Sequence, residues 1–178
     1  TFTNVTAKNN SAGCSGGGIR SNNSTFTNVT VENNSAGSSG GGIRGNSSTF
    51  INVTIENNSS DSSGGGILST NKSTFTDVTV LNNSSGYTGG GIEGSGTFTD
   101  VTVENNSAVS SGGGIYIRST STLTRVDIRG NESRFSVGGG LFSFGGDIDL
   151  TEVMFVGNTA GNGNGDSGGG AHIQNATL

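Results

Sequence analysis

A nine-residue block recurs seven times along the chain without insertion or deletion, and this repetition limits the possible folds more than any other feature. Each block is followed by three glycines and one apolar residue, and the whole unit occupies about 24 residues. Such a period is typical of proteins built from stacked units. All differences in length fall in the two connections, before and after the glycines. The seven copies are Phe2–Asn10, Phe26–Asn34, Phe50–Asn58, Phe75–Asn83, Phe98–Asn106, Leu123–Asn131 and Leu150–Asn158.

The residues of the block favour β-strands. In the second copy Val29 and Val31 alternate with Thr30, which is the two-residue period of a strand. The preceding apolar residue, Phe26, is three positions from Val29, so we expect a bend near Asn28. Thr, Val, Ile and Phe favour strands, whereas the abundant Gly, Ser and Asn disfavour helices. Each coil is therefore predicted to contain three short strands with the sequences GGGI, TFT and VTVEN.

Only 28% of the residues are hydrophobic, so one coil cannot bury an apolar face by itself. Coils stacked about 4.8 Å apart would place equivalent side chains in continuous internal columns. We therefore predict an all-β fold, a right-handed single-stranded parallel β-helix of seven coils. Residues 1–178 would form one domain, as a fragment or segment of a longer repeat array. The predicted aromatic column consists of Phe2, Phe26, Phe50, Phe75 and Phe98, and leucines continue it.

The asparagine that ends each block is predicted to lie inside the coil. A buried amide is costly unless it is hydrogen-bonded, and a stacked ladder of amides removes that cost. We expect the glycine triplets to supply positive φ angles and close packing at the sharpest corner. The predicted ladder consists of Asn10, Asn34, Asn58, Asn83, Asn106, Asn131 and Asn158.

Two short motifs resemble a known family. The sequence FVGN at Phe155–Asn158, followed by Thr159 and Ala160, matches the FxxN element of the chlamydial polymorphic outer-membrane proteins. The GGGI and GGGL segments resemble the GGAI element of that family, with glycine at the alanine position. Elsewhere Val or Ile replaces the Phe of FxxN. The resemblance implies a right-handed β-helix that is displayed at the surface, as an adhesin or an autotransporter passenger.

These observations favour an extracellular or cell-surface structural or adhesive module, such as a fibre-forming subunit or an adhesin stalk, over an enzyme. Neither end of the sequence shows a polar or helical cap, and bare strand edges invite end-to-end self-association. A surface receptor or a glycan is a further expected partner. With a net charge of −5 and scattered cations, nucleic acid is not expected as a partner. We expect no membrane span in this segment and no cofactor.

An ice-binding protein is the first alternative. Threonines on either side of each inward Phe must point outward because neighbours in a strand alternate. Stacking would give two parallel threonine ranks on one face, similar to the surface of β-helical antifreeze proteins. A third rank on the next strand favours the simpler interpretation of good strand-forming surface residues. The candidate surface-binding residues are Thr25, Thr27, Thr74, Thr76, Thr97, Thr99, Thr122 and Thr124.

A polysaccharide lyase-like enzyme is the second alternative, because such chemistry needs carboxylates converging on one groove. The available acids lie where the repeat degenerates, so we interpret them as sequence drift and predict no catalytic residues. His172 has no Ser or Cys partner, and Cys14 is alone and cannot form an internal disulfide. The acids concerned are Asp147, Asp149, Glu152 and Asp166, near Arg125 and Asp127.

The outward polar residues include candidates for glycosylation and for metal binding. Asn4, Asn28 and Asn52 begin NVT sequons and are candidate glycosylation sites, and NNS sequons follow in five copies. Glu32 and Glu56 occupy one column and would repel each other, but Leu81 interrupts the column before Glu104. The stretch GNGNGD at residues 161–166 resembles a calcium-binding nonapeptide repeat, yet it occurs once. We therefore predict a loop there and no metal site.

Overall fold

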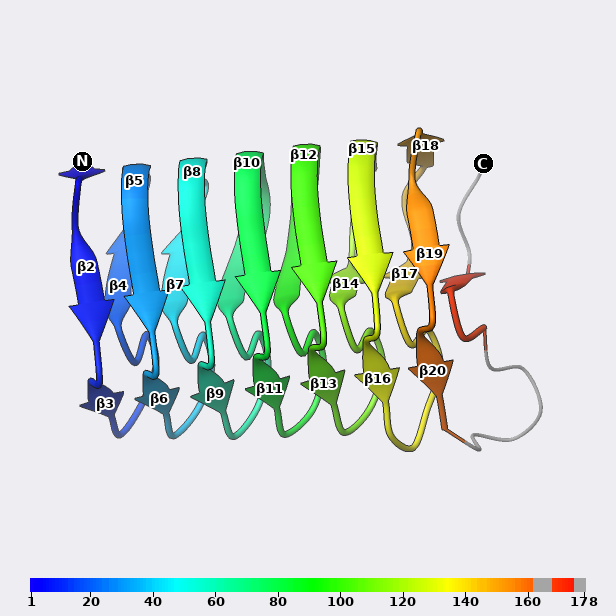
Figure 1. Cartoon of the computed structure of the whole chain (residues 1–178), viewed down its shortest axis with the longest axis horizontal. Coiled ribbons are helices and arrows are strands. Elements are labelled where there is room, and N and C mark those ends of the chain that lie inside the picture. The colour runs from blue at the N-terminus through cyan, green and yellow to red at the C-terminus, as the bar shows by residue number, and fades with distance from the viewer. Residues whose placement is uncertain (162–167, 175–178) are drawn as a thin grey trace.

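The computed structural model describes residues 1–161 and 168–174 and shows a row of stacked β-strand coils (Figure 1). With the N-terminal coil at the left, the front strands run downward and the strands behind them return upward, so the coil is right-handed. All the strand pairs are parallel. The prediction of a right-handed parallel β-helix is confirmed.

Each coil contributes three strand segments, which we name the Ile, Phe and Ser strands after a residue that many of them contain. The Ile strands are β4 (Ile19–Asn22), β7 (Ile43–Asn46), β14 (Ile115–Ile117), β17 (Leu141–Phe144) and β21 (Ala171–Gln174). The Ser strands are β3 (Ser11–Ala12), β6 (Ser35–Ala36), β9 (Ser59–Ser60), β11 (Ser84–Ser85), β13 (Ser107–Ala108), β16 (Glu132–Ser133) and β20 (Thr159–Ala160).

The Phe strands carry the nine-residue block. In two coils the Ile strand continues into the Phe strand, which gives β10 (Ile67–Leu81) and β12 (Ile92–Glu104). In the first and last coils the Phe strand is split at the bend. The remaining strands are β1 (Phe2–Thr3), β2 (Thr6–Lys8), β5 (Thr25–Glu32), β8 (Thr49–Glu56), β15 (Ser121–Arg129), β18 (Ile148–Thr151) and β19 (Met154–Val156).

Three strands per coil are confirmed, but their boundaries differ from those predicted. TFT and VTVE form one strand that bends at the left-handed residue Asn28, whose φ is 55°. The glycine triplet lies before the Ile strand rather than in it. The third strand is the two-residue Ser strand, which the sequence analysis did not predict. Within the part of the chain that the structure describes, no helix is long and apolar enough to cross a membrane.

The bends recur at the same position in every coil because the residues there adopt positive φ. Residues equivalent to Asn28 have φ of 53–56°, and Arg125 and Glu152 adopt this conformation despite its steric cost for long side chains. At the next corner, equivalents of Asn33 have φ of 55–62°, and Gly130 and Gly157 replace Asn in the last two complete coils. Asn and Gly tolerate this region best, which explains the asparagine-rich block.

The interior is formed by the predicted columns. The rings of neighbouring phenylalanines are stacked with centroids 4.5–4.9 Å apart and planes within 8°. Four of these five side chains, from Phe26 to Phe98, are fully buried, and Leu123 continues the column. The Val and Ile columns are equally buried. Each fully buried apolar side chain of this size stabilises the fold by about 1.5–3 kcal/mol.

Candidate functional surfaces

The terminal asparagines of the blocks form a hydrogen-bonded ladder along the axis. Between each pair of neighbouring coils from Asn10 to Asn158, the side-chain nitrogen of one asparagine donates to the side-chain oxygen of the next over 2.9–3.0 Å. The same oxygen also accepts the backbone N–H of the previous asparagine. The nitrogen of Asn34 additionally donates to the carbonyls of Ala7 and Glu32. The amides from Asn34 to Asn131 are therefore satisfied although they are buried, whereas Asn10 in the first coil is exposed and Asn158 in the last is half-buried.

A second ladder, made of serines, lies at the corner between the Ile and Phe strands. The backbone N–H of Ser48 donates to Ser73 Oγ over 3.0 Å, and Ser48 Oγ donates to the carbonyl of Asn46. Ser24 and Ser121 make equivalent bonds. This ladder was not predicted from the sequence, although its signal is a serine two residues before the Phe or Leu of the block in four copies.

The candidate surface-binding threonines lie in two ranks on the outer face of the Phe strands, where they are half-buried or exposed. Thr25, Thr74, Thr97 and Thr122 belong to one register column. The second column contains Thr27, Thr76, Thr99 and Thr124 in the same register. Ile51, which is 38% exposed, interrupts the second rank, and Asp149 ends the first. The third rank, from Thr6 to Thr102, lies beyond the bend.

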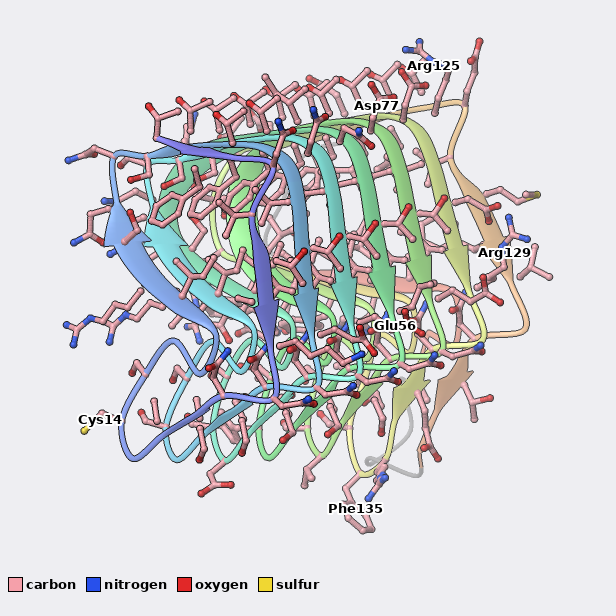
Figure 2. The ribbon with its side chains drawn as sticks, turned by 60° about the vertical axis from the view of Figure 1, so that its left-hand side comes forward. Cys14, Glu56, Asp77, Arg125, Arg129 and Phe135 are labelled. Atoms are coloured by element: carbon pink, nitrogen blue, oxygen red, sulfur yellow. The ribbon has the colours of Figure 1, made fainter. Side chains whose placement is uncertain are left out.

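The candidate glycosylation sites lie on the exposed corner at the bend of the Phe strands. Asn28 donates its side-chain N–H to Asn4 Oδ1 over 3.0 Å, and Asn52 donates to Asn28 Oδ1 over 2.8 Å. A glycan would be attached to that same nitrogen, so it would replace one of its N–H donors. The corner continues through Asp77 to Arg125, which Figure 2 labels along one edge of the molecule.

Arg125 and Asp100 form a bidentate pair on this corner. Arg125 Nε donates to Asp100 Oδ1 over 2.6 Å, and Nη2 donates to Oδ2 over 2.8 Å. These hydrogen bonds hold the pKa of the Asp100 carboxyl below its ordinary value, since they favour the charged form more than desolvation opposes it. The same pair raises the pKa of Arg125.

Replacing Arg125 by alanine is expected to return the pKa of Asp100 toward the ordinary aspartate value. Because the folded-state pKa is lowered, the pair stabilises the fold above the unfolded-state pKa, and this stabilisation is lost as the pH falls. NMR titration of the Asp100 carboxyl carbon in both proteins would measure the change. Salt should reduce the difference because both groups are exposed. An unchanged titration in the variant would contradict the pairing.

The face beyond the bend carries a column of charged residues in which Glu32 and Glu56 are neighbours. Lys8 Nζ contacts Glu32 Oε2 at 2.9 Å, and Glu56 follows in register. Arg129 pairs with Asp127 on its own strand, and Figure 2 shows Glu56 and Arg129 on this one face. Among the described residues, no three His, Cys, Asp or Glu side chains come together as metal ligands would. Residues 162–167, which include most of the GNGNGD stretch, lie outside the described part of the chain.

The candidate acids that the structure describes do not converge on one groove. Asp149 lines a shallow open depression with Thr122 and Thr151. Asp127 lies on the other side of the bend at Arg125. Asp147 is exposed, as is Glu152 on the bend, and Asp166 lies outside the described residues. The His172 ring stacks on Phe142 with centroids 5.5 Å apart, and Cys14 is exposed on a loop (Figure 2).

One column of outward residues on the Ile strands was not predicted. It contains the most varied residue types of any column in the molecule. Glu93 is 7% exposed, accepts a hydrogen bond from the Thr88 hydroxyl and pairs with Arg118 Nε at 3.0 Å. The Arg118 guanidinium also lies over the Tyr116 ring, 4.6 Å from its centroid. Burial raises the pKa of Tyr116, and Arg118 opposes that shift. We call the following seven residues the Ile-strand file: Arg20, Arg44, Leu68, Glu93, Tyr116, Phe142 and His172.

Comparison with protein families places two coils of this architecture in a known repeat. Residues 52–70 and 100–118 match the Chlamydia polymorphic membrane protein repeat. Each matched range runs from a bend residue through the buried Asn and the glycine triplet to the Ile strand. The matched polymorphic membrane protein repeats cover about a fifth of the chain and do not include FVGN at Phe155–Asn158. No curated protein and no solved structure matched the chain.

Proposed function

We propose that this chain is a structural module displayed at the cell surface, where it holds adhesive sites on a rigid rod, and that it has no catalytic role. The observation that carries the proposal is the unbroken register of the internal columns, from Phe2 to Leu150 and from Asn10 to Asn158. Seven coils at the strand spacing give a rod of roughly 30 Å. The match to a membrane protein repeat supports the surface location.

The surface location can be tested with an antibody against the folded chain. We expect it to label intact cells of the source organism as strongly as permeabilised cells, and we expect external protease to remove the signal. An antibody against a cytoplasmic protein, which should label only permeabilised cells, is the control. Labelling that requires permeabilisation would rule out the proposed location.

The adhesive role is a separate step and needs its own assay. Beads coated with the folded chain should bind to target cells or matrix, and beads coated with heat-unfolded chain should not. Equal retention of the two kinds of bead would indicate nonspecific adhesion and would leave the chain a passive spacer.

We also propose that the terminal coils stack on further coils, from the same chain or from a second copy. Among residues 1–161 and 168–174, β1 and β3 of the first coil pair with β5 and β6 on one edge only, and β20 of the last coil pairs only with β16. Unpaired edges of this kind favour strand addition. Analytical ultracentrifugation and negative-stain microscopy should show elongated assemblies whose length increases with concentration, whereas monomers at all concentrations would contradict stacking on a second copy.

Ice binding is a second candidate, favoured by the in-register threonine ranks described above. A thermal-hysteresis assay tests it, with Thr76→Tyr and Thr99→Tyr to disrupt the face. Hysteresis in the original chain that is lost in both variants would support it. The absence of thermal hysteresis in the folded original chain would contradict ice binding.

A further inference from the structure

The Ile-strand file differs from the Thr, Asn and Ser columns because its residue changes along the coils. Those columns keep one residue type in at least four coils, whereas no residue type occurs in more than two positions of the file. In a stacked repeat the invariant positions support the packing, and insertions gather on the face that binds. Both connections of variable length, before the triplet and after the Ile strand, flank this file.

The cations without a carboxylate partner are concentrated on the same side. Within the described residues, Arg20, Arg44 and Lys72 make no ion pair, and they lie on β4, on β7 and in the segment of β10 that leads to the next corner. The chain has 13 acidic residues for 8 basic ones, so acids are not scarce. The five cations that are paired are Lys8, Arg118, Arg125, Arg129 and Arg134.

Arg20 and Arg44 are direct register partners on neighbouring parallel strands. Like charges in that position repel each other, and an anion bound between them would remove the repulsion. Arg44 Nη1 donates to Ser15 Oγ over 3.0 Å, so the loop before the triplet holds this guanidinium in place. A guanidinium has five N–H donors, and those that remain suit the two oxygens of a carboxylate or a sulfate.

The middle of the file offers charged and hydroxyl side chains. A small cavity there is lined by Ser69, Thr70, Glu93, Gly94, Ser95 and Arg118. The apolar members of the file are covered, since Leu68, Tyr116 and Phe142 are only 6–8% exposed. A polypeptide partner would need an exposed apolar anchor, whereas a sugar chain uses hydroxyl, amide and charged partners.

We propose that the Ile-strand file binds an anionic polysaccharide that runs along the rod axis, with its carboxylate or sulfate groups across Arg20, Arg44 and Lys72. Its hydroxyl groups lie over the cavity beside Glu93 and Arg118. This inference rests on the proposed surface function, because it names the class of ligand that the displayed module holds. The stacked Phe, Asn and Thr columns then serve as the scaffold of the binding face.

The test compares two pairs of substitutions that remove the same charge. Arg20→Gln with Arg44→Gln removes the unpaired arginines, and Lys8→Gln with Arg134→Gln removes two paired cations elsewhere. Heparin oligosaccharide, polygalacturonate oligosaccharide, neutral dextran and polyglutamate are the probes, measured by calorimetry at about 0.15 M salt, where the Debye length is about 8 Å. We expect the original chain to bind at least one anionic glycan. The first pair should weaken that binding about 100-fold, because each charged hydrogen-bonding group contributes about tenfold. The control pair should change it less than about threefold, as expected for screened distant charges.

Several outcomes would overturn the proposal. These are no binding of either anionic glycan, equal loss in the control pair, or polyglutamate binding as tight as the glycans. Circular dichroism melting checks that the variants fold. Should the glutamine pair unfold, Arg20→Lys with Arg44→Lys keeps the charge and should still weaken binding about tenfold by loss of the bidentate geometry. Glycan binding without surface labelling of cells would contradict only the proposed surface function. Surface labelling of cells without glycan binding would contradict only this inference.

Discussion

Asn83→Ala is expected to lower the free energy of unfolding by about 3–5 kcal/mol, because it leaves two or more buried polar groups without a partner at about 1–3 kcal/mol each. Asn83 Oδ1 accepts the backbone N–H of Asn58 over 2.8 Å, and Asn83 Nδ2 donates to the carbonyl of Ile55 over 3.0 Å. Alanine supplies neither group, and a position that is 1% exposed is closed to bulk water. Such a loss is a large fraction of the total stability of a domain.

The neighbouring residue provides the matched control for this ladder prediction. Asn82 is exposed and adopts φ of 55°, which glycine tolerates without strain. Asn82→Gly should therefore change the free energy of unfolding by no more than about 0.5 kcal/mol. Urea denaturation of both variants, followed by circular dichroism, measures the contrast. Equal losses for the two substitutions would mean that the ladder does not contribute more than the bend beside it.

Gly90→Ala is expected to cost at least about 3 kcal/mol or to abolish soluble expression, because its new methyl group has no room. A Cβ at this second glycine of the triplet would overlap the carbonyl oxygen of Gly113 and the backbone of Ser107. Both neighbours are backbone atoms of the next coil, so they cannot rotate away as a side chain would. The two coils would have to separate and weaken the hydrogen bonds between them.

Gly13 is the control for the glycine prediction. It lies on an exposed loop, and a Cβ there would meet no atom within 4 Å. Gly13→Ala should be neutral or should stabilise the fold by up to about 1 kcal/mol, because alanine restricts the unfolded chain. Thermal melting of both variants, with soluble yield as a second readout, tests the pair. A Gly90→Ala protein as stable as Gly13→Ala would show that the coils are less closely packed than described.

The sequence predicted those features that depend on equivalence between repeats. The bend at Asn28 follows from the spacing of apolar residues within one block. Stacking of equivalent coils then repeats this bend in all seven coils and places the phenylalanines, continued by leucines, in one column. The structure also places the outward threonines in ranks, because alternation on a strand leaves them no other direction. Register in a parallel stack is determined by the buried columns, so these conclusions needed no structural information.

Features that do not repeat, or that are too short to have a period, could not be predicted in this way. Ser35–Ala36 is a strand of two residues, and two residues show no alternation. The Ile-strand file changes type from Arg44 to Leu68 to Glu93, so comparison of the repeats gives no signal for it. The ion pair of Glu93 with Arg118 joins residues 25 positions apart, and only the coil geometry brings them together.

The backbone hydrogen bonds between coils run along the row of coils, since each coil pairs with the one before and the one after it (Figure 1). A pulling force applied at the two ends therefore acts on all the interfaces between coils in series. The force that the module withstands is set by its weakest interface. That interface is the first one along the Phe strands, where the unbroken β5 faces two short strands, β1 and β2, in five register pairs, whereas β15 faces β18 and β19 in seven. Extension under tension should begin there and leave the other five interfaces intact.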